Sequence, residues 1–131
     1  PFLVCSTVEG ILAQRLVRKV CMQCREDYTP AREIVDDLDL TSDMVRGKRF
    51  YRGAGCEICN NTGYKGRVGL FELMVMSPEL RDAVMANCQT DELREMARKG
   101  GMVSLRDAGI KACFDGTTTP DEVVRETVLE A

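Results

Sequence analysis

Two short motifs, Cys21-Met22-Gln23-Cys24 and Cys56-Glu57-Ile58-Cys59, decide how this chain folds. Each motif places two thiols three positions apart, and 31 residues separate the two motifs. Two Cys-x-x-Cys pairs are typical of a structural zinc site, in which four thiolates surround the ion and leave no open position for catalysis. The sequence therefore predicts one zinc ion bound by Cys21, Cys24, Cys56 and Cys59.

The rest of the composition limits the available functions. The chain has 131 residues, seven cysteines, no histidine and a formal net charge of −3. Without histidine, a zinc site is expected to be all-cysteine, and catalysis that needs an imidazole base is excluded. The net negative charge argues against a general nucleic-acid binder. An odd number of cysteines, four of them spaced for metal, fits a reducing cytosol, and no apolar run approaches the ~18 residues that span a bilayer.

Dithiol redox chemistry is the main alternative use of the two motifs. It usually needs a single Cys-x-x-Cys at a helix start in a thioredoxin-like βαβ frame, and the sequence offers no such frame. The remaining cysteines are expected to be small buried apolar side chains on or beside helices. They are Cys5, Cys88 and Cys113.

The segment before the first motif is predicted to be an amphipathic helix ending near Lys19. Ser6 and Glu9 stand three apart, as in a capping box. Apolar residues then recur every fourth position, at Val8, Leu12, Leu16 and Val20. Such a repeat is typical of one helix face. The last predicted turn carries three cations: Arg15, Arg18 and Lys19. Favourable placement at the helix's negative end explains them, and contact with phosphate or an acidic neighbour is the alternative.

Between the motifs, the sequence predicts two short helical segments and one strand. Thr29-Pro30 opens a helix over about 31–38, Thr41 or Ser42 opens a further turn, and residues 48–52 form a strand. Glycines flank the second motif, at Gly53, Gly55, Gly63 and Gly66. They are expected to provide positive-φ turns that direct backbone N–H groups at the cysteine sulfurs.

Residues 67–75 form the clearest predicted strand. Their near-continuous apolarity indicates a strand covered on both faces, as in a parallel sheet. Because few other strands are predicted to pair with it, we expect the rest of that sheet to belong to a longer protein of which this chain is a piece. Glu72 stands alone among apolar neighbours, and it is expected either to face solvent or to pair with a cation.

Four helices are predicted after the strand. Their boundaries are marked by Ser77-Pro78, Thr90, Gly100-Gly101, Ser104, Gly116, the capping box Thr119-Pro120-Asp121-Glu122, and an end at Val128. Short loops between them predict a compact antiparallel cluster. The chain contains neither a Gly-x-x-x-x-Gly-Lys-Ser/Thr phosphate loop nor a nucleophile beside a base, so its own residues are expected to catalyse nothing.

Several runs of residues match one protein family. Residues 10–21, 55–67, 69–73, 102–109 and 116–123 resemble the signature of the secretion and pilus-assembly ATPases, the motors of type II secretion and type IV pilus extension. The resemblance covers essentially the whole chain, and the tetracysteine block makes it specific. The wording Cys-Asn-Asn-Thr-Gly-Tyr-Lys-Gly over 59–66 favours the pilus-assembly branch.

The resemblance implies a C-terminal piece of a hexameric cytoplasmic ATPase at the bacterial inner membrane, with ATP and magnesium bound by the parent protein. The implied fold is α+β and mainly helical. A helix of a RecA-like core would occupy 1–20, a zinc module 21–66, a late core strand 67–76 and a helical subdomain 77–131.

The implied partners are the inner-membrane platform protein and neighbouring subunits, without specific nucleic-acid binding. We expect four basic residues to border the contact surface: Lys48, Arg49, Arg52 and Lys65. The alternative function is a free-standing zinc-ribbon adaptor that binds protein or nucleic acid. Salt-sensitive RNA or DNA binding would favour that adaptor.

Overall fold

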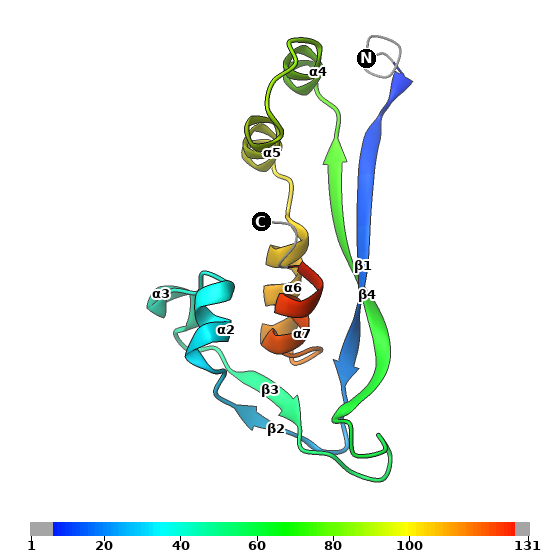
Figure 1. The fold of residues 1–131 in the computed structure, drawn as a ribbon, viewed down its shortest axis with the longest axis vertical. Helices are drawn as coiled ribbons and strands as arrows, with labels where there is room; N and C mark the ends of the chain where they lie inside the picture. The colour runs from blue at the N-terminus through cyan, green and yellow to red at the C-terminus, as the bar shows by residue number, and fades with distance from the viewer. Residues whose placement is uncertain (1–6, 128–131) are drawn as a thin grey trace. The chain divides into compact units, whose positions relative to one another are not determined.

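The computed structural model describes residues 7–127. The predictions for Cys5, Ser6 and Val128 lie outside these residues. Its strands are β1 (Gly10–Val20), β2 (Arg25–Tyr28), β3 (Phe50–Gly53) and β4 (Tyr64–Val75) (Figure 1). Its helices are α2 (Arg32–Asp37), α3 (Ser42–Val45), α4 (Pro78–Met85), α5 (Thr90–Lys99), α6 (Leu105–Phe114) and α7 (Pro120–Thr127). The α+β class is confirmed.

The predicted helix before the first motif is wrong, because residues 10–20 form strand β1. A spacing of four is also a multiple of two, so Leu12, Leu16 and Val20 share one face of a strand as readily as one face of a helix. Leu12 and Leu16 are exposed, whereas the β-branched Val17 and Val20 are buried. Pairing with β4 thus decided a pattern that local sequence left ambiguous, and the RecA-like helix expected over 1–20 is not present in the described residues.

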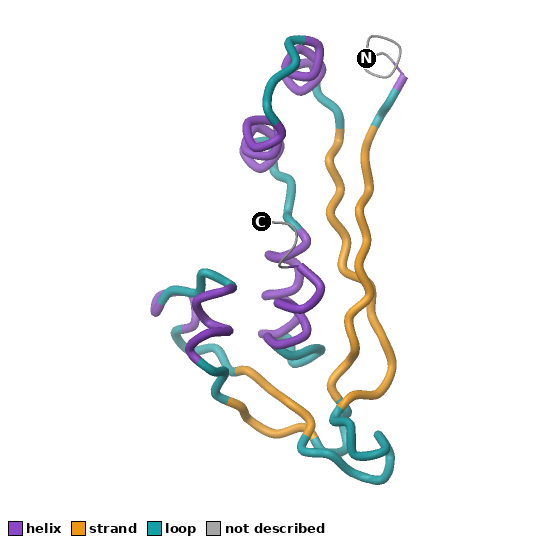
Figure 2. Tube along the Cα trace, in the orientation of Figure 1, coloured by secondary structure: helices purple, strands orange, loops and turns teal. Residues whose placement is uncertain are grey.

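Strand β4 confirms the strand predicted over 67–75, but its surroundings differ from the prediction. It pairs with β1 in a two-stranded sheet (Figure 2), and the two arrows run in opposite directions in Figure 1. Phe71, Leu73 and Val75 are 52%, 51% and 64% exposed. Within this chain β4 is therefore neither part of a parallel sheet nor covered on both faces. The covering sheet expected from a longer protein stays a prediction, because an apolar pattern says which faces can be buried and not what covers them.

Strands β2 and β3 form a second, antiparallel two-stranded sheet. Arg25 lies opposite Gly53, and Tyr28 lies opposite Phe50. The strand predicted over 48–52 corresponds to β3. Strand β2 was not predicted, since its sequence Arg-Glu-Asp-Tyr is polar and too short to show an alternating pattern.

The helix boundaries largely follow the capping residues. Thr41 Oγ1 accepts the Met44 N–H at 3.3 Å, and Ser77 Oγ accepts the Leu80 N–H at 3.2 Å. Both bonds satisfy an N–H that the first helical turn leaves without an intrahelical partner. The predicted starts at Thr29-Pro30 and Thr90 are each displaced slightly, because the N-cap residues are Ala31 and Gln89.

The chain divides into two compact units. The first unit comprises residues 1–13 and 71–104, and the second comprises 14–70 and 105–131. Strands β1 and β4 contribute to both. Helices α4 and α5 belong to the first unit and α6 and α7 to the second, and the helical subdomain over 77–131 stays a prediction. The module boundaries at residues 20, 66 and 76 likewise stay predictions.

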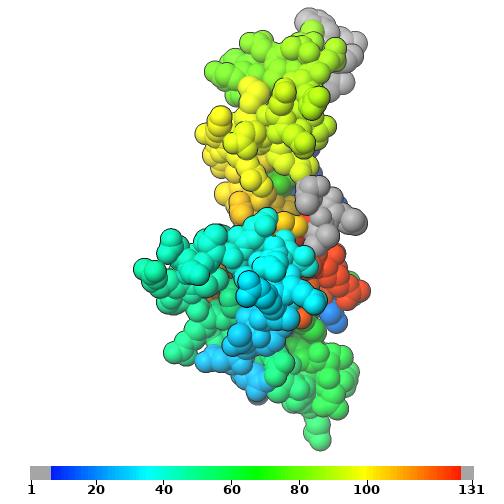
Figure 3. All heavy atoms as spheres, turned by 60° about the vertical axis from the view of Figure 1, so that its left-hand side comes forward, coloured from blue at the N-terminus to red at the C-terminus, as the bar shows by residue number. Residues whose placement is uncertain are grey.

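The core of the second unit joins the segment between the cysteine motifs to the last two helices. Its buried members are Leu38, Phe50, Ile110, Cys113 and Val123. Helices α2 and α3 form the near face of this unit in Figure 3 (cyan). Cys113 is buried as predicted, and burial raises the pKa of its thiol to about 12.

Helices α6 and α7 pack closely at Gly109. A Cβ atom at this position would lie 2.6 Å from Val123 Cγ1 and 3.2 Å from Leu70 Cδ1. Only glycine allows this approach without displacing a buried side chain.

Candidate metal centre

The structure brings together the four cysteines that the sequence singled out. The Sγ atoms of Cys21, Cys24, Cys56 and Cys59 all lie within 4.8 Å of one another. Three of the separations are 3.7 Å (Cys21–Cys56), 3.8 Å (Cys24–Cys59) and 3.7 Å (Cys56–Cys59). Four sulfurs placed ~2.3 Å from a common ion at tetrahedral corners would lie about 3.8 Å apart, whereas a disulfide requires about 2.05 Å. The cluster fits a four-thiolate metal site and not a pair of disulfides.

Strand ends position each motif. Cys21 directly follows β1 and donates its N–H to Gly63 O at 2.9 Å. Cys24 immediately precedes β2, and its carbonyl accepts the Ala54 N–H at 3.0 Å. The second motif lies in the loop between β3 and β4. The first motif therefore lies between β1 and β2, and the second lies between β3 and β4.

Backbone N–H groups point at two of the sulfurs, as the flanking glycines predicted. Gly55 N donates to Cys24 Sγ at 3.2 Å, and Gly63 N donates to Cys59 Sγ at 3.2 Å. Both glycines have positive φ angles, of 102° and 82°. A Cβ atom on Gly53 would overlap the backbone of Gly63, so this approach of two loops also needs glycine.

Burial and these N–H donors shift the pKa values of two of the thiols in opposite directions. Burial raises the pKa of Cys59, but the N–H groups of Cys56 and Gly63 outweigh it and lower that pKa to about 6. Burial likewise raises the pKa of Cys24. The Gly55 N–H lowers it by less, so the pKa of this thiol is about 12. Because thiolates and not thiols bind metal, binding at this cluster is expected to release protons.

A four-sulfur site of this kind is chemically closed. All four corners are protein sulfurs, so no position remains for water or substrate, and the arrangement suits a structural and not a catalytic metal. The cluster also belongs to the second unit, where its two motifs lie in the β1–β2 and β3–β4 connections.

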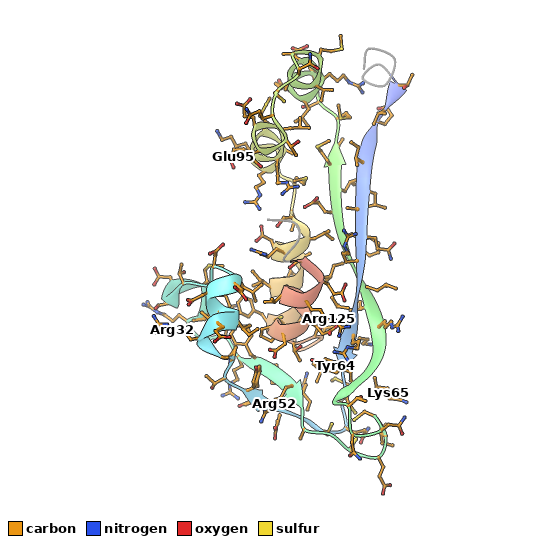
Figure 4. All side chains as sticks on the ribbon, in the orientation of Figure 1. Arg32, Arg52, Tyr64, Lys65, Glu95 and Arg125 are labelled. Atoms are coloured by element: carbon orange, nitrogen blue, oxygen red, sulfur yellow. The ribbon has the colours of Figure 1, made fainter. Side chains whose placement is uncertain are left out.

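An ion pair between the half-buried Arg18 and the buried Glu122 is only half predicted by the sequence. For Arg18 the sequence favours placement at a helix end, with contact with phosphate or an acidic neighbour as the alternative, and the acidic neighbour is confirmed. Its Nε and Nη2 atoms donate to Glu122 Oε1 at 3.0 and 2.7 Å. The guanidinium also lies over the Tyr64 ring, 4.0 Å from its centroid. Figure 4 shows Tyr64 at the start of β4.

Glu122 was interpreted as a helix-capping residue. The capping hydrogen bond is present, since Glu122 N donates to Thr119 Oγ1 at 3.1 Å. Its carboxylate, 3% exposed, binds Arg18 instead of returning to the cap. Burial raises the pKa of this carboxyl, but the Arg18 guanidinium and N–H lower it more, and the net shift is below the ordinary value. No sequence signal could pair two residues 104 positions apart.

The other charged residues named from the sequence lie outside the cluster. Arg15 is exposed and donates to Gln14 O at 3.0 Å. Glu72 is half-buried on β4. The predicted solvated acids on and after α2 are exposed: Asp36, Asp37 and Asp39.

Comparison with known proteins identifies the family. The model of the type II/IV secretion system protein family matches residues 1–125. The chain belongs to this family. The resemblance noted from the sequence is thereby confirmed, and the tetracysteine cluster lies within the matched region.

Curated relatives of this secretion family come from both branches. The chain is 41% identical over 128 residues to the type IV pilus assembly ATPase PilB of Thermus thermophilus, covering 98% of this chain and 14% of that protein. It is 39% identical over 127 residues to the type II secretion system protein HxcR of Pseudomonas aeruginosa, covering 97% and 23%. It is 38% identical over 126 residues to the type II secretion system protein E of Xanthomonas campestris, covering 96% and 22%.

The chain thus spans between about a seventh and a quarter of the length of these relatives. Within residues 7–127, no helix has both the length and the apolar character needed to cross a bilayer.

Proposed function

We propose that this chain is the C-terminal portion of a hexameric cytoplasmic ATPase that powers type IV pilus assembly or type II secretion at the inner membrane. The observation that carries the proposal is the family match over residues 1–125, together with relatives that are several times longer. ATP and magnesium would bind elsewhere in the parent, because these 131 residues include no phosphate-loop motif. In the parent, β4 would serve as a late strand of the ATPase core.

The coding sequence upstream of Pro1 tests the motor assignment. A phosphate loop followed by an uninterrupted reading frame into Pro1 is the expected result. A native start codon immediately before Pro1 would contradict it and favour an independent adaptor.

Within that motor, we propose that Cys21, Cys24, Cys56 and Cys59 hold one structural zinc ion. The separations of 3.7–3.8 Å support this, as does the closed set of four sulfurs. The ion would fix the two loops between strands, which are too polar to be stabilised by apolar burial alone. The ion would be coordinated by the four sulfurs and would take no part in catalysis.

Elemental analysis of the purified chain tests the zinc assignment. One zinc per chain is expected, and none after replacement of any single ligand by serine. Cys88→Ser is the matched control, because Cys88 lies in the first unit. Metal-free protein with the four thiols paired as disulfides would overturn the assignment.

We further propose that the platform protein binds beside β2 and β3. A groove of about 460 Å³ is lined there mainly by apolar side chains, including Tyr28, Pro30 and Val45, with Lys48 and Arg49 among its lining residues. Arg49 and Arg52 pair with Asp27 and Glu26. Lys65 donates to Ile58 O at 3.4 Å (Figure 4).

Lys48 differs from Arg49 and Arg52, which already pair with carboxylates, and from Lys65, which does not line the groove. Its ammonium lies 5.6 Å from the centroid of Phe114, and the described residues give it no carboxylate partner. It is therefore the cation with most to gain from an acidic partner. In the full-length motor, Lys48→Glu is expected to weaken platform binding at least tenfold. Lys99→Glu, on α5, is the control, and unchanged binding by Lys48→Glu would contradict this surface.

A further inference from the structure

The last residues of β1 have a second hydrogen-bonding partner besides β4. Arg18 N donates to Glu122 Oε2 at 2.9 Å, and Val20 N donates to Thr117 O at 2.9 Å. Between them, Thr118 Oγ1 donates to Arg18 O at 2.8 Å. We call residues 117–122 the edge segment, because it satisfies the backbone groups along the edge of β1 that faces away from β4.

The edge segment also binds the first residue of β4. The Tyr64 and Thr119 hydroxyl oxygens lie 2.8 Å apart in a hydrogen bond. The Arg18 guanidinium lies over the Tyr64 ring and binds Glu122, so one buried carboxylate ties both strands to α7. Figure 4 shows Tyr64 and Arg125 on these neighbouring elements.

Both strands lead directly into the cysteine cluster. Cys21 follows Val20, and Gly63 precedes Tyr64. Gly63 accepts the Cys21 N–H through its carbonyl and donates its own N–H to Cys59 Sγ. The edge segment therefore holds two strands whose next residues are one metal ligand and the backbone donor to another.

The edge segment is itself anchored to the end of α6. Thr117 N donates to Ala112 O at 2.9 Å, and Gly116 makes the turn with a φ of 78°. Thr118 and Glu122 are buried, which removes competing water from their hydrogen bonds. The contacts are thus directional and shielded, unlike an exposed surface ion pair.

We infer that the edge segment positions the metal site, with Glu122 and Thr118 as positioning residues that act through β1 and β4. The inference rests on the proposed metal function. Neither side chain touches a sulfur, so their effect is to restrict the strand ends and keep Cys21 and Gly63 in place. By linkage, metal binding and docking of the α7 start stabilise each other.

Zinc release provides the test. The zinc-loaded 131-residue chain is mixed with excess chromophoric chelator, and the rate of zinc transfer is followed. Loss of a group that is hydrogen-bonded to a metal ligand typically costs about 10–100-fold in metal affinity, and Glu122 acts one step further from the metal. Glu122→Gln is expected to release zinc about tenfold faster or more. Glu126→Gln, one turn along α7 with its carboxylate 3.9 Å from Arg125 Nε, should stay within about twofold of the wild-type rate.

Thr118 gives a second, independent pair of variants if Glu122→Gln does not fold. Thr118→Val removes the hydroxyl that bonds Arg18 O while keeping the shape, and zinc release should accelerate. Thr118→Ser keeps the hydroxyl and should restore the slow rate. A restored rate in Thr118→Ser separates positioning from a general loss of stability.

The absorption spectrum of the cobalt-substituted protein shows whether all four sulfurs still bind the metal. The sulfur-to-cobalt charge-transfer band should persist in Glu122→Gln and Thr118→Val, because all four ligands remain. Wild-type release rates in both variants would overturn the inference, as would equal acceleration in Glu126→Gln. Absence of zinc from the wild-type chain would instead overturn the proposed metal function, so the two failures are distinguishable.

Discussion

The two units of this chain differ in what holds them together. The second unit combines a buried apolar core, an ion pair with a buried carboxylate and the four-cysteine cluster. In the described part of the first unit, the buried apolar side chains are Leu80 and Ala97, while Phe71, Leu73 and Val75 stay exposed. A cleft of about 450 Å³ lies among β4, α4 and α5 in that unit. In the second unit, the cysteine cluster, the apolar core and the polar network therefore support the same residues, whereas the first unit depends on sparse packing.

The largest effect is expected from removing a metal ligand, which should unfold much of the second unit and leave the first unit unchanged. Replacing Cys56 by serine should abolish zinc binding and unfold α6 and α7 together with residues 21–66, because Ile110, Cys113 and Val123 share a core with Leu38 and Phe50. Structural zinc contributes on the order of 10 kcal/mol in small modules. Hydrogen exchange should show α4 and α5 unchanged.

This outcome differs from the one that the sequence alone suggests, in which all helices after Ser77 survive loss of the metal. Persistent protection of α6 and α7 in Cys56→Ser would restore that simpler picture. Cys88→Ser, in the first unit, should leave the exchange pattern of the second unit intact.

A matched pair of leucines gives the next largest effect. Leu105 is 0% exposed in the second unit, whereas Leu73 is 51% exposed in the first. Leu105→Ala should lower the free energy of unfolding by about 2–5 kcal/mol, and Leu73→Ala by about 0.5 kcal/mol or less. Urea denaturation measures both, and equal costs would show that exposure does not distinguish the units.

A smaller effect concerns pH. The folded pKa of Glu122 lies below its unfolded value near 4.5, so its contribution to stability is present above that pH and is lost as the pH falls through the folded value. Hydrogen bonds to a charged group are worth about 1.5–3 kcal/mol. Glu122→Gln should remove this contribution, which makes the difference in unfolding free energy between wild type and variant shrink below pH 4.5. A difference that is constant from pH 7 to pH 3 would contradict the assignment.

The smallest effect is expected at the exposed ion pairs of β2 and β3. Arg52 Nε lies 3.1 Å from Glu26 Oε1, with both side chains about half exposed. Arg52→Gln should change the free energy of unfolding by less than about 1 kcal/mol, because solvent screens such pairs. A larger loss in thermal denaturation would mean that the surface of the second unit adds materially to its stability.

Local signals predicted much of the fold. Thr41 and Ser77 cap the helices expected of them, and Gly55 and Gly63 direct their N–H groups at sulfur as expected. These predictions succeeded because each depends on residues a few positions apart. The strand β1 was missed because its four-residue repeat fits helix and strand equally well, and its pairing with β4 lies beyond any local window.

Residue types and short spacings alone were enough to predict the cluster of four cysteines, the family and most helix starts. Tertiary structure alone decided that β1 is a strand, that Glu122 binds Arg18, and that α6 and α7 share a core with the segment between the motifs. The physical reason is that hydrogen-bonded strand edges, buried charges and packed side chains are satisfied by partners distant in the chain, and only the folded backbone selects those partners.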